Sequence, residues 1–352
     1  MERFCVGIDV SAKKLDVAYR GQRQGVVVQT FENAPASHAA LVKHLAKRAG
    51  RTGTIRVVLE STGVYGIEVA TALDRAGCEV MVVNPRAAAH FAKAAMQRSK
   101  TDPLDAAMLL RFAEQMPFTR WKAPSVAQMQ IRMISRRVHA LTATIAEEKN
   151  RLHAAGHLGE GRIIKRSIES TVRALDKEVA RLRAEALKLI ASEPTLERRY
   201  ELLLSVKGIA EKSAIAIVAE LAVLPSDMTD RQWVAHAGLD PRLFESGTSI
   251  HATARISKRG NKYLRSALYK PAQTACTHDT GVKAYAARLR ERGKAPLQVH
   301  VAVMRKLLHA IHAMFASDQL FDSSRFSPAA GAVGTAEIAP SAISAVSIAL
   351  RS

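Results

Sequence analysis

Short apolar runs alternate with helical patterns over the first 115 residues of the chain. The runs predict strands at residues 4–10, 15–20, 25–31, 54–59 and 78–83. Spacings of three and four residues, with capping and breaking residues at their ends, predict helices at residues 37–48, 63–75, 86–96 and 102–115. Three meandering strands followed by alternating helices and strands predict a mixed sheet flanked by helices.

The middle of the chain has a longer period. Apolar side chains recur at alternating steps of three and four along residues 134–152 and 168–189, with a glycine-rich break at 155–161. This spacing predicts two long helices, each with a narrow apolar stripe that pairs with another helix. The pattern fits a helical hairpin within one chain and a coiled coil between subunits equally well.

Glycine turns separate shorter helices beyond residue 200. A helix, a tight turn at Gly208 and a second helix at 211–224 resemble the helix-hairpin-helix that holds a DNA backbone through turn amides. Lys207 and Ala210 stand where such turns usually carry Pro and Gly, so phosphate binding and a purely structural hairpin both stay open.

These changes of pattern predict an α/β segment at 1–125, a helical hairpin at 126–200 and a mainly α-helical segment at 201–325. Residues 326–352 consist mostly of Ala, Ser, Gly and Pro, and we expect them to be disordered.

Charge points to the class of partner. The 352 residues include 52 Lys and Arg against 32 Asp and Glu, a formal net charge of +20, which favours phosphate-rich polymers. Residues 251–300 alone carry 11 basic and 2 acidic side chains, the electrostatic pattern of a nucleic-acid surface. The sequence has no apolar run of about 18 residues and no signal-peptide pattern, so we expect a cytoplasmic, nucleoid-associated protein without a membrane partner.

Four carboxylates are candidates for metal chemistry. Asp9 and Glu60 end two predicted strands, and Asp102 and Asp105 share one face of a predicted helix. Each has a structural alternative, for example as a first-turn partner of the helix dipole. Together they form an oxygen-only set typical of Mg²⁺ or Mn²⁺ sites. Two such ions about 3.5–4 Å apart can support phosphodiester cleavage.

The same residues lie in blocks that resemble the DEDD-type insertion-sequence transposases, the relatives of the pilin-gene invertase. The N-terminal blocks are residues 6–11 (VGIDVS), 13–17 (KKLDV), 59–65 (LESTGVY), 83–85 (VNP) and 100–106 (KTDPLDA). The C-terminal blocks are residues 208–209 (GI), 237–239 (AGL), 244–247 (FESG) and 256–261 (ISKRGN). The resemblance runs in order from about residue 5 to 325.

The resemblance implies a RuvC-like, RNase H-like N-terminal domain in which Asp9, Glu60, Asp102 and Asp105 bind Mg²⁺, with Mn²⁺ as a substitute. It also implies a C-terminal transposase domain whose Ser246 attacks a DNA phosphate and forms a covalent serine–DNA intermediate. Some members of the family use a structured bridge RNA that pairs with donor and target DNA, which makes such a guide RNA a further expected partner. We also expect a homo-oligomer, a dimer or a tetramer.

Basic residues follow Ser246 closely. Arg255, Lys258, Arg259, Lys262 and Arg265 would share faces of a helix, although Gly260 equally allows a loop followed by a helix. With Lys207, they are the predicted phosphate contacts.

Three functions remain open from the residues alone. The leading one is a recombining transposase that uses Ser246. The second is a RuvC-like nuclease or junction resolvase that uses water, and the third is a nucleic-acid-binding protein without catalysis. On local grounds Ser246 is a weak candidate, because Ser-Gly is a common turn and no evident histidine base accompanies it.

Overall fold

The computed structural model describes residues 3–21, 25–50, 53–60, 65–96, 101–156, 161–242, 245–246, 250–251 and 255–326. The chain divides into two compact units, Met1–Ser125 and Val126–Ser352. The tail predicted to be disordered lies, beyond Phe326, outside the described residues.

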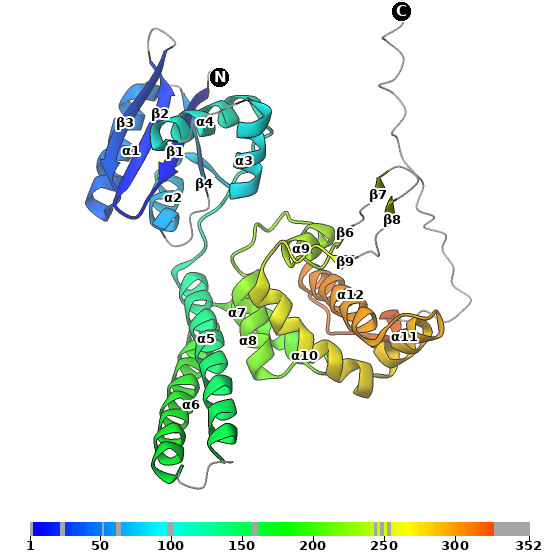
Figure 1. Ribbon diagram of the computed structural model, residues 1–352. Coiled ribbons are helices and arrows are strands. Elements are labelled where there is room, and N and C mark those ends of the chain that lie inside the picture. The colour runs from blue at the N-terminus through cyan, green and yellow to red at the C-terminus, as the bar shows by residue number, and fades with distance from the viewer. Residues whose placement is uncertain are drawn as a thin grey trace, which may run out of the picture. The chain divides into compact units, whose positions relative to one another are not determined.

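Unit 1 is built on a five-stranded mixed sheet (Figure 1). Its strands are β1 (Arg3–Val10), β2 (Lys14–Arg20), β3 (Val26–Glu32), β4 (Thr54–Glu60) and β5 (Glu79–Val83). The order across the sheet is β3-β2-β1-β4-β5, with β1, β4 and β5 parallel and the first two hairpin pairs antiparallel. The predicted mixed α/β arrangement is therefore confirmed.

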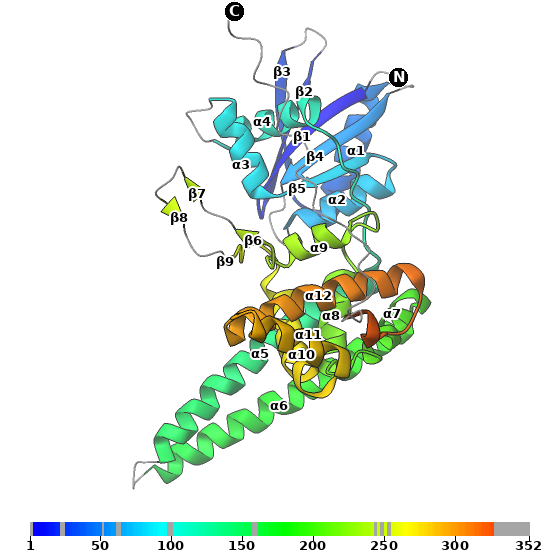
Figure 2. The same ribbon diagram turned by 90° about the vertical axis from the view of Figure 1, so that its right-hand side faces the viewer.

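Helices cover both faces of this sheet (Figure 2). They are α1 (Pro35–Ala49), α2 (Tyr65–Arg75), α3 (Pro85–Ala94) and α4 (Asp102–Gln115). Alternate strand residues such as Val6 and Ile8 form one core with Leu41 of α1 and Leu73 of α2. The opposite face packs against α3 and α4, where Val58 meets Phe112.

Helix α4 lies directly on the backbone of β1. A Cβ atom at Gly7 would stand 2.1 Å from the Leu110 nitrogen and 2.3 Å from the Ala106 oxygen. Backbone atoms cannot rotate away as side chains can, so this close approach requires glycine. The contact sets the distance between the strand that ends near Asp9 and the helix that begins at Asp102.

Unit 2 begins with a long helical hairpin of α5 (Val126–Gly156) and α6 (Arg162–Ala191). The two helices pack along their lengths, and Val138, Leu141 and Ile145 of the predicted stripe are buried. Of the two arrangements that the pattern allowed, the hairpin within one chain is present. The α6 stripe is less completely covered, since Val172 and Leu175 are only half-buried.

The rest of unit 2 is mainly helical. Its helices are α7 (Pro194–Leu204), α8 (Glu211–Leu221), α9 (Asp230–His236), α10 (Lys262–His278), α11 (Thr280–Glu291) and α12 (Pro296–Ser317), followed by the 3-10 turn η1 (Ser323–Phe326). One core joins them around the apolar sides of α8 and α12. Among the helices of the described residues, none is both long enough and apolar enough to cross a membrane.

Four two-residue strands lie between α9 and α10. The strand β6 (Pro241–Arg242) pairs antiparallel with β9 (Arg255–Ile256). The strand β7 (Glu245–Ser246) pairs antiparallel with β8 (Ile250–His251).

Candidate active site

The period of two along each strand places several acids on one face of the sheet. Residues 6, 8, 15, 17, 57 and 59 belong to the core under α1 and α2. The alternate side chains of Asp9, Asp16 and Glu60 therefore project toward the face that α4 covers. Asp9 and Asp16 are direct partners across the β1–β2 ladder. The Ile8–Leu59 pair of the β1–β4 ladder immediately precedes Asp9 and Glu60.

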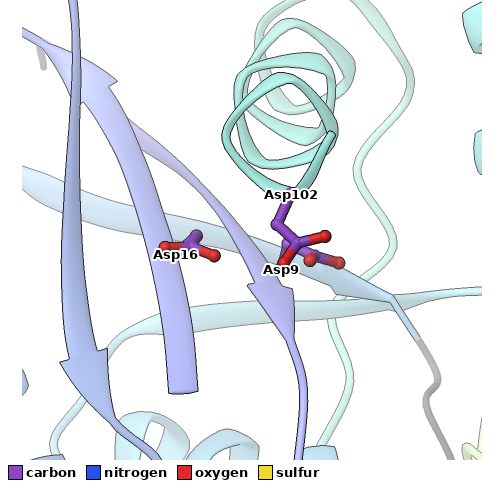
Figure 3. A group of neighbouring side chains, drawn as sticks. All are labelled: Asp9, Asp16 and Asp102. Carbon is purple, nitrogen blue, oxygen red and sulfur yellow. The ribbon is translucent and has the colours of Figure 1, made fainter. Parts of the chain in front are cut away.

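The N-terminus of α4 completes the group. Figure 3 shows the Asp102 side chain directed from the helix toward Asp9, with Asp16 on the neighbouring strand. One carboxylate oxygen from each of Asp9, Asp16 and Asp102 lies within 4.8 Å of the others. Helix α4 begins at Asp102 because Thr101 has extended dihedral angles and Pro103 favours the first turn.

Electrostatics connects the predicted acids to one another. Partial burial raises the pKa of Asp9 to about 6, and the negative charges of the other acids raise it further, those of Asp105, Asp102, Glu60 and Asp16 in decreasing order. All four predicted acids thus act on one carboxyl group. Mutual repulsion of this kind is what a bound cation relieves.

Asp16 was not among the candidates from the sequence. It is only 3% exposed, and its Oδ1 accepts a hydrogen bond of 2.6 Å from the Thr30 hydroxyl on β3. A carboxylate buried in the middle of a strand pattern, at position 16 of the run 15–20, was the available signal. Its position opposite Asp9 depends on strand pairing, which the pattern of residues 15–20 alone does not define.

A second unpredicted residue is basic. The Lys14 ammonium lies 2.8 Å from Asp102 Oδ2 and 3.1 Å from Asp16 Oδ2. Hydrogen bonds to Asp102 and then to Asp16 raise the pKa of Lys14. Lys14 therefore offsets part of the negative charge at the edge of the cluster.

The donor set fits a hard divalent cation. The converging side chains offer carboxylate oxygens, the ligands that Mg²⁺ and Mn²⁺ prefer. A cation would also relieve the repulsion that raises the Asp9 pKa. The site could therefore hold a metal without any further protein group.

Ser246 belongs to unit 2, whereas the acids belong to unit 1. It stands in β7, opposite Ile250 of β8. Its partner strands sit within a segment of which residues 243–244, 247–249 and 252–254 are outside the described part of the chain.

The predicted basic residues flank a turn and the start of a helix. Arg255 belongs to β9, and Lys258 and Arg259 lie in the loop that ends at the N-cap residue Asn261. Lys262 opens α10, so the arrangement is a loop followed by a helix, the second of the two forms that Gly260 allowed. Arg255, Lys258, Arg259 and Lys262 are exposed.

Backbone contacts hold this basic loop against the end of α9. The Lys258 amide donates to the Gly238 oxygen at 3.1 Å, and Lys258 itself has a left-handed φ of 51°. A Cβ atom at Gly260 would stand 2.2 Å from the His236 oxygen. The loop is therefore closely fitted, and its exposed cations are presented in a defined conformation.

Arg265 and Lys207 differ in their surroundings. The Arg265 guanidinium is half-buried and donates from Nη1 to the Ala237 oxygen at 2.8 Å, which holds the end of α9. Lys207 is exposed beside Gly208, whose φ is +106°. A Cβ atom at Gly208 would lie 2.7 Å from the Pro271 oxygen of α10, so this turn also has a packing role.

Comparisons with known proteins place this arrangement in a family. The sequence model of the DEDD-type IS110 transposases matches residues 6–158, and that of the transposase IS116/IS110/IS902 family matches residues 200–287. The pilin gene-inverting proteins of Moraxella bovis and Moraxella lacunata are each 25% identical over 323 residues, which cover 92% of this chain and 98% of theirs. An uncharacterized 43.6 kDa protein of insertion element IS110 from Streptomyces coelicolor is 26% identical over 161 residues, 46% of this chain and 38% of its own length. The chain thus belongs to the DEDD-type IS110 transposases, enzymes that recombine DNA.

Proposed function

We propose that this transposase cuts and rejoins DNA through an RNase H-like, RuvC-like domain at residues 1–125 that binds Mg²⁺. Asp9, Glu60, Asp102 and Asp105 would hold the metal, and Asp16 would contribute an oxygen or a hydrogen-bonded support beside them. The observation that carries this proposal is the convergence of carboxylates around Asp9, whose pKa is raised to about 6. A bound divalent ion supplies Lewis acidity at the scissile phosphate.

We assign the nucleophile to Ser246. Its Oγ forms a bond to phosphorus while the bond from phosphorus to one sugar oxygen breaks, and the hydroxyl proton is transferred to the released oxygen. A serine–phosphate ester conserves the bond energy that rejoining requires, whereas hydrolysis loses it. The resemblance of residues 244–247 to the family's serine block supports this assignment. The proposal requires Ser246 to meet the acids of its own or another subunit.

We propose double-stranded donor and target DNA as substrates, with a structured bridge RNA as guide. The exposed cations Lys207, Arg255, Lys258, Arg259 and Lys262 would contact phosphates, and Arg265 would support the loop that presents three of them. Sequence would be read by base pairing with the RNA, while the protein holds the backbones.

The same proposal includes the domain arrangement and the assembly. Residues 126–200 form the helical hairpin, and residues 201–325 form the C-terminal transposase domain. The half-buried stripe of α6, including Val172 and Leu175, supports pairing with another subunit in a dimer or tetramer.

The second candidate is a RuvC-like nuclease that uses water in place of Ser246. Replacing Ser246 by Ala distinguishes the two, because it removes the attacking oxygen and adds no bulk. We expect Ser246→Ala to fold and bind DNA normally but not to recombine. On a nicked substrate the unsubstituted protein should retain covalently bound DNA that maps to the peptide containing Ser246. Recombination by Ser246→Ala would return the mechanism to water.

A further inference from the structure

The loops that follow the strands of Asp9 and Glu60 are joined by one side chain. Asn33, directly after β3, donates from Nδ2 to the Ser11 oxygen at 2.8 Å and to the Tyr65 oxygen at 3.1 Å. Ser11 stands two positions after Asp9, and Tyr65 stands five positions after Glu60. A single amide group thus spans the backbone beyond the two metal-binding strands.

The remaining groups of Asn33 are also engaged. Its backbone amide donates to the Lys13 oxygen at 3.0 Å, which fixes the β1–β2 turn relative to the end of β3. Its Oδ1 lies 2.8 Å from Nε2 of His38 on α1. Since the Asn33 oxygen can only accept, Nε2 of His38 must carry the proton. His38 is 3% exposed, so the imidazole itself is held by the packing of α1.

This arrangement continues the sheet where its ladder ends. The β1–β4 ladder reaches the pair Ile8–Leu59, after which no backbone pair between these two strands holds Asp9 against Glu60 among the described residues. The Asn33 amide replaces such a pair with two hydrogen bonds to the diverging segments. His38 prevents the amide from rotating, because a flipped Asn33 would place its NH₂ group against the protonated Nε2.

We propose that Asn33, oriented by His38, is a positioning residue that sets the spacing of the Asp9 and Glu60 carboxylates for metal binding. The inference rests on the proposed function, in which these two acids hold the metal. Asn33 touches no reacting atom and acts through backbone that follows the ligands. Side chains that orient metal ligands typically contribute about 10-fold to 100-fold to metal affinity.

The test measures Mn²⁺ affinity by isothermal titration calorimetry on the full chain without DNA. Asn33→Ala should bind Mn²⁺ about 10-fold to 100-fold more weakly than the unsubstituted protein, with an unchanged circular dichroism spectrum. His38→Ala should give a similar loss. His38→Gln should restore most of the affinity, because its terminal amide can donate to Asn33 Oδ1 as the imidazole does.

Asn84→Ala provides a matched control. Asn84 caps α3 in the same unit by accepting a hydrogen bond from the Arg86 amide at 2.9 Å. Its loss should lower the melting temperature and leave Mn²⁺ affinity unchanged, which separates stability from positioning.

The outcomes distinguish the inference from the function on which it rests. Affinity equal to that of the unsubstituted protein in Asn33→Ala, or in both His38 variants, overturns the positioning role alone. Equal losses in His38→Ala and His38→Gln overturn the orienting role of the His38 proton. Absence of Mn²⁺ binding in the unsubstituted protein, or full binding in Asp9→Asn, overturns the proposed metal site and the inference with it.

Discussion

The Asp9 carboxylate is held in a charged state that the fold itself disfavours. Its pKa is raised to about 6 by burial and by neighbouring acids, compared with about 3.9 in an unfolded chain. The folded protein therefore holds this proton more tightly than the unfolded one. Stability falls as pH rises from about 4 to about 6 and stays lower above that range.

Replacing Asp9 by Asn removes this penalty. In metal-free protein at pH 8, Asp9→Asn should raise the free energy of unfolding by about 1–2 kcal/mol, a value reduced from the full shift for solvent screening. At pH 4 the difference should largely disappear, because the carboxyl group is then mostly protonated in both states. Urea unfolding in EDTA at several pH values measures this, and a variant no more stable than the parent at pH 8 would contradict it.

The same substitution should abolish catalysis. Asp9→Asn, Glu60→Gln, Asp102→Asn and Asp105→Asn each remove a negative oxygen ligand, so strand cleavage should fall by at least about 100-fold in each. Cleavage of a labelled DNA junction measures the effect. Asp227→Asn, which neutralises an exposed acid of unit 2, is the charge-matched control. Full activity of any two of the four variants in excess Mg²⁺ would exclude a shared cluster.

At this scale the sequence was informative about strand ends and less so about strand interiors. Asp9 and Glu60 could be proposed because each interrupts an apolar run at the point where a strand finishes. Asp16 faces the same cluster, but only the antiparallel register with β1 places it opposite Asp9. Lys14 and Asn33 lie in ordinary turn sequence, and their contacts arise from segments distant along the chain.

At the scale of elements, the basic loop between β9 and α10 is the clearest candidate surface. Replacing Lys258, Arg259 and Lys262 by Gln should weaken nucleic-acid binding almost equally for all sequences. The slope of log K against log salt should flatten by about 0.9 for each duplex phosphate that the variant no longer neutralises. Binding measured at several salt concentrations tests this.

The control for the loop lies on the hairpin. Arg166, Arg173 and Lys177 are exposed on α6, and their replacement by Gln removes the same charge from another element. If both triple variants change the slope equally, the loop has no special role and net charge alone determines binding.

The hairpin offers a separate prediction. Leu141 is 5% exposed and belongs to the stripe that packs α5 on α6. Leu141→Ala should destabilise the protein by about 2–4 kcal/mol through reduced burial and a cavity. Val172→Ala, at the half-buried stripe of α6, should cost less, and analytical ultracentrifugation would show whether it also lowers the mass in solution. Equal thermal stability of Leu141→Ala and the parent would contradict this packing.

Heptad spacing was enough to predict both long helices, because the period of a packed stripe is a local property of sequence. It could not choose the partner helix, since within-chain and between-chain packing use the same side chains. Charge spacing was similarly ambiguous at residues 255–265. Helix α10 starts only at Lys262, since Gly260 makes a close backbone contact and Asn261 caps the helix by accepting from the Tyr263 and Leu264 amides.

At the scale of the whole molecule, the chain consists of two compact units with separate cores. Calorimetry should therefore record two unfolding transitions rather than one. Mg²⁺ binds only the folded acid cluster, so it should raise the midpoint of the unit 1 transition alone; at 100 times its dissociation constant the gain is about 2.7 kcal/mol.

Two observations would check that assignment. Asp105→Asn should abolish the Mg²⁺-dependent shift and leave the other transition unchanged. A single transition that shifts as a whole with Mg²⁺ would instead mean that the two units unfold together.

The close packing at Gly7 has a consequence for how copies of such a mobile gene are judged. Any side chain at position 7 would meet the backbone of α4 at Ala106 and Leu110, and the helix could accommodate it only by moving away from β1. That movement would carry Asp102 and Asp105 away from Asp9. A genomic copy with all four acid codons intact and a changed seventh codon should therefore be as inactive as one that has lost an acid. Surveys of decayed insertion sequences that score only the acids would count such relics as live elements.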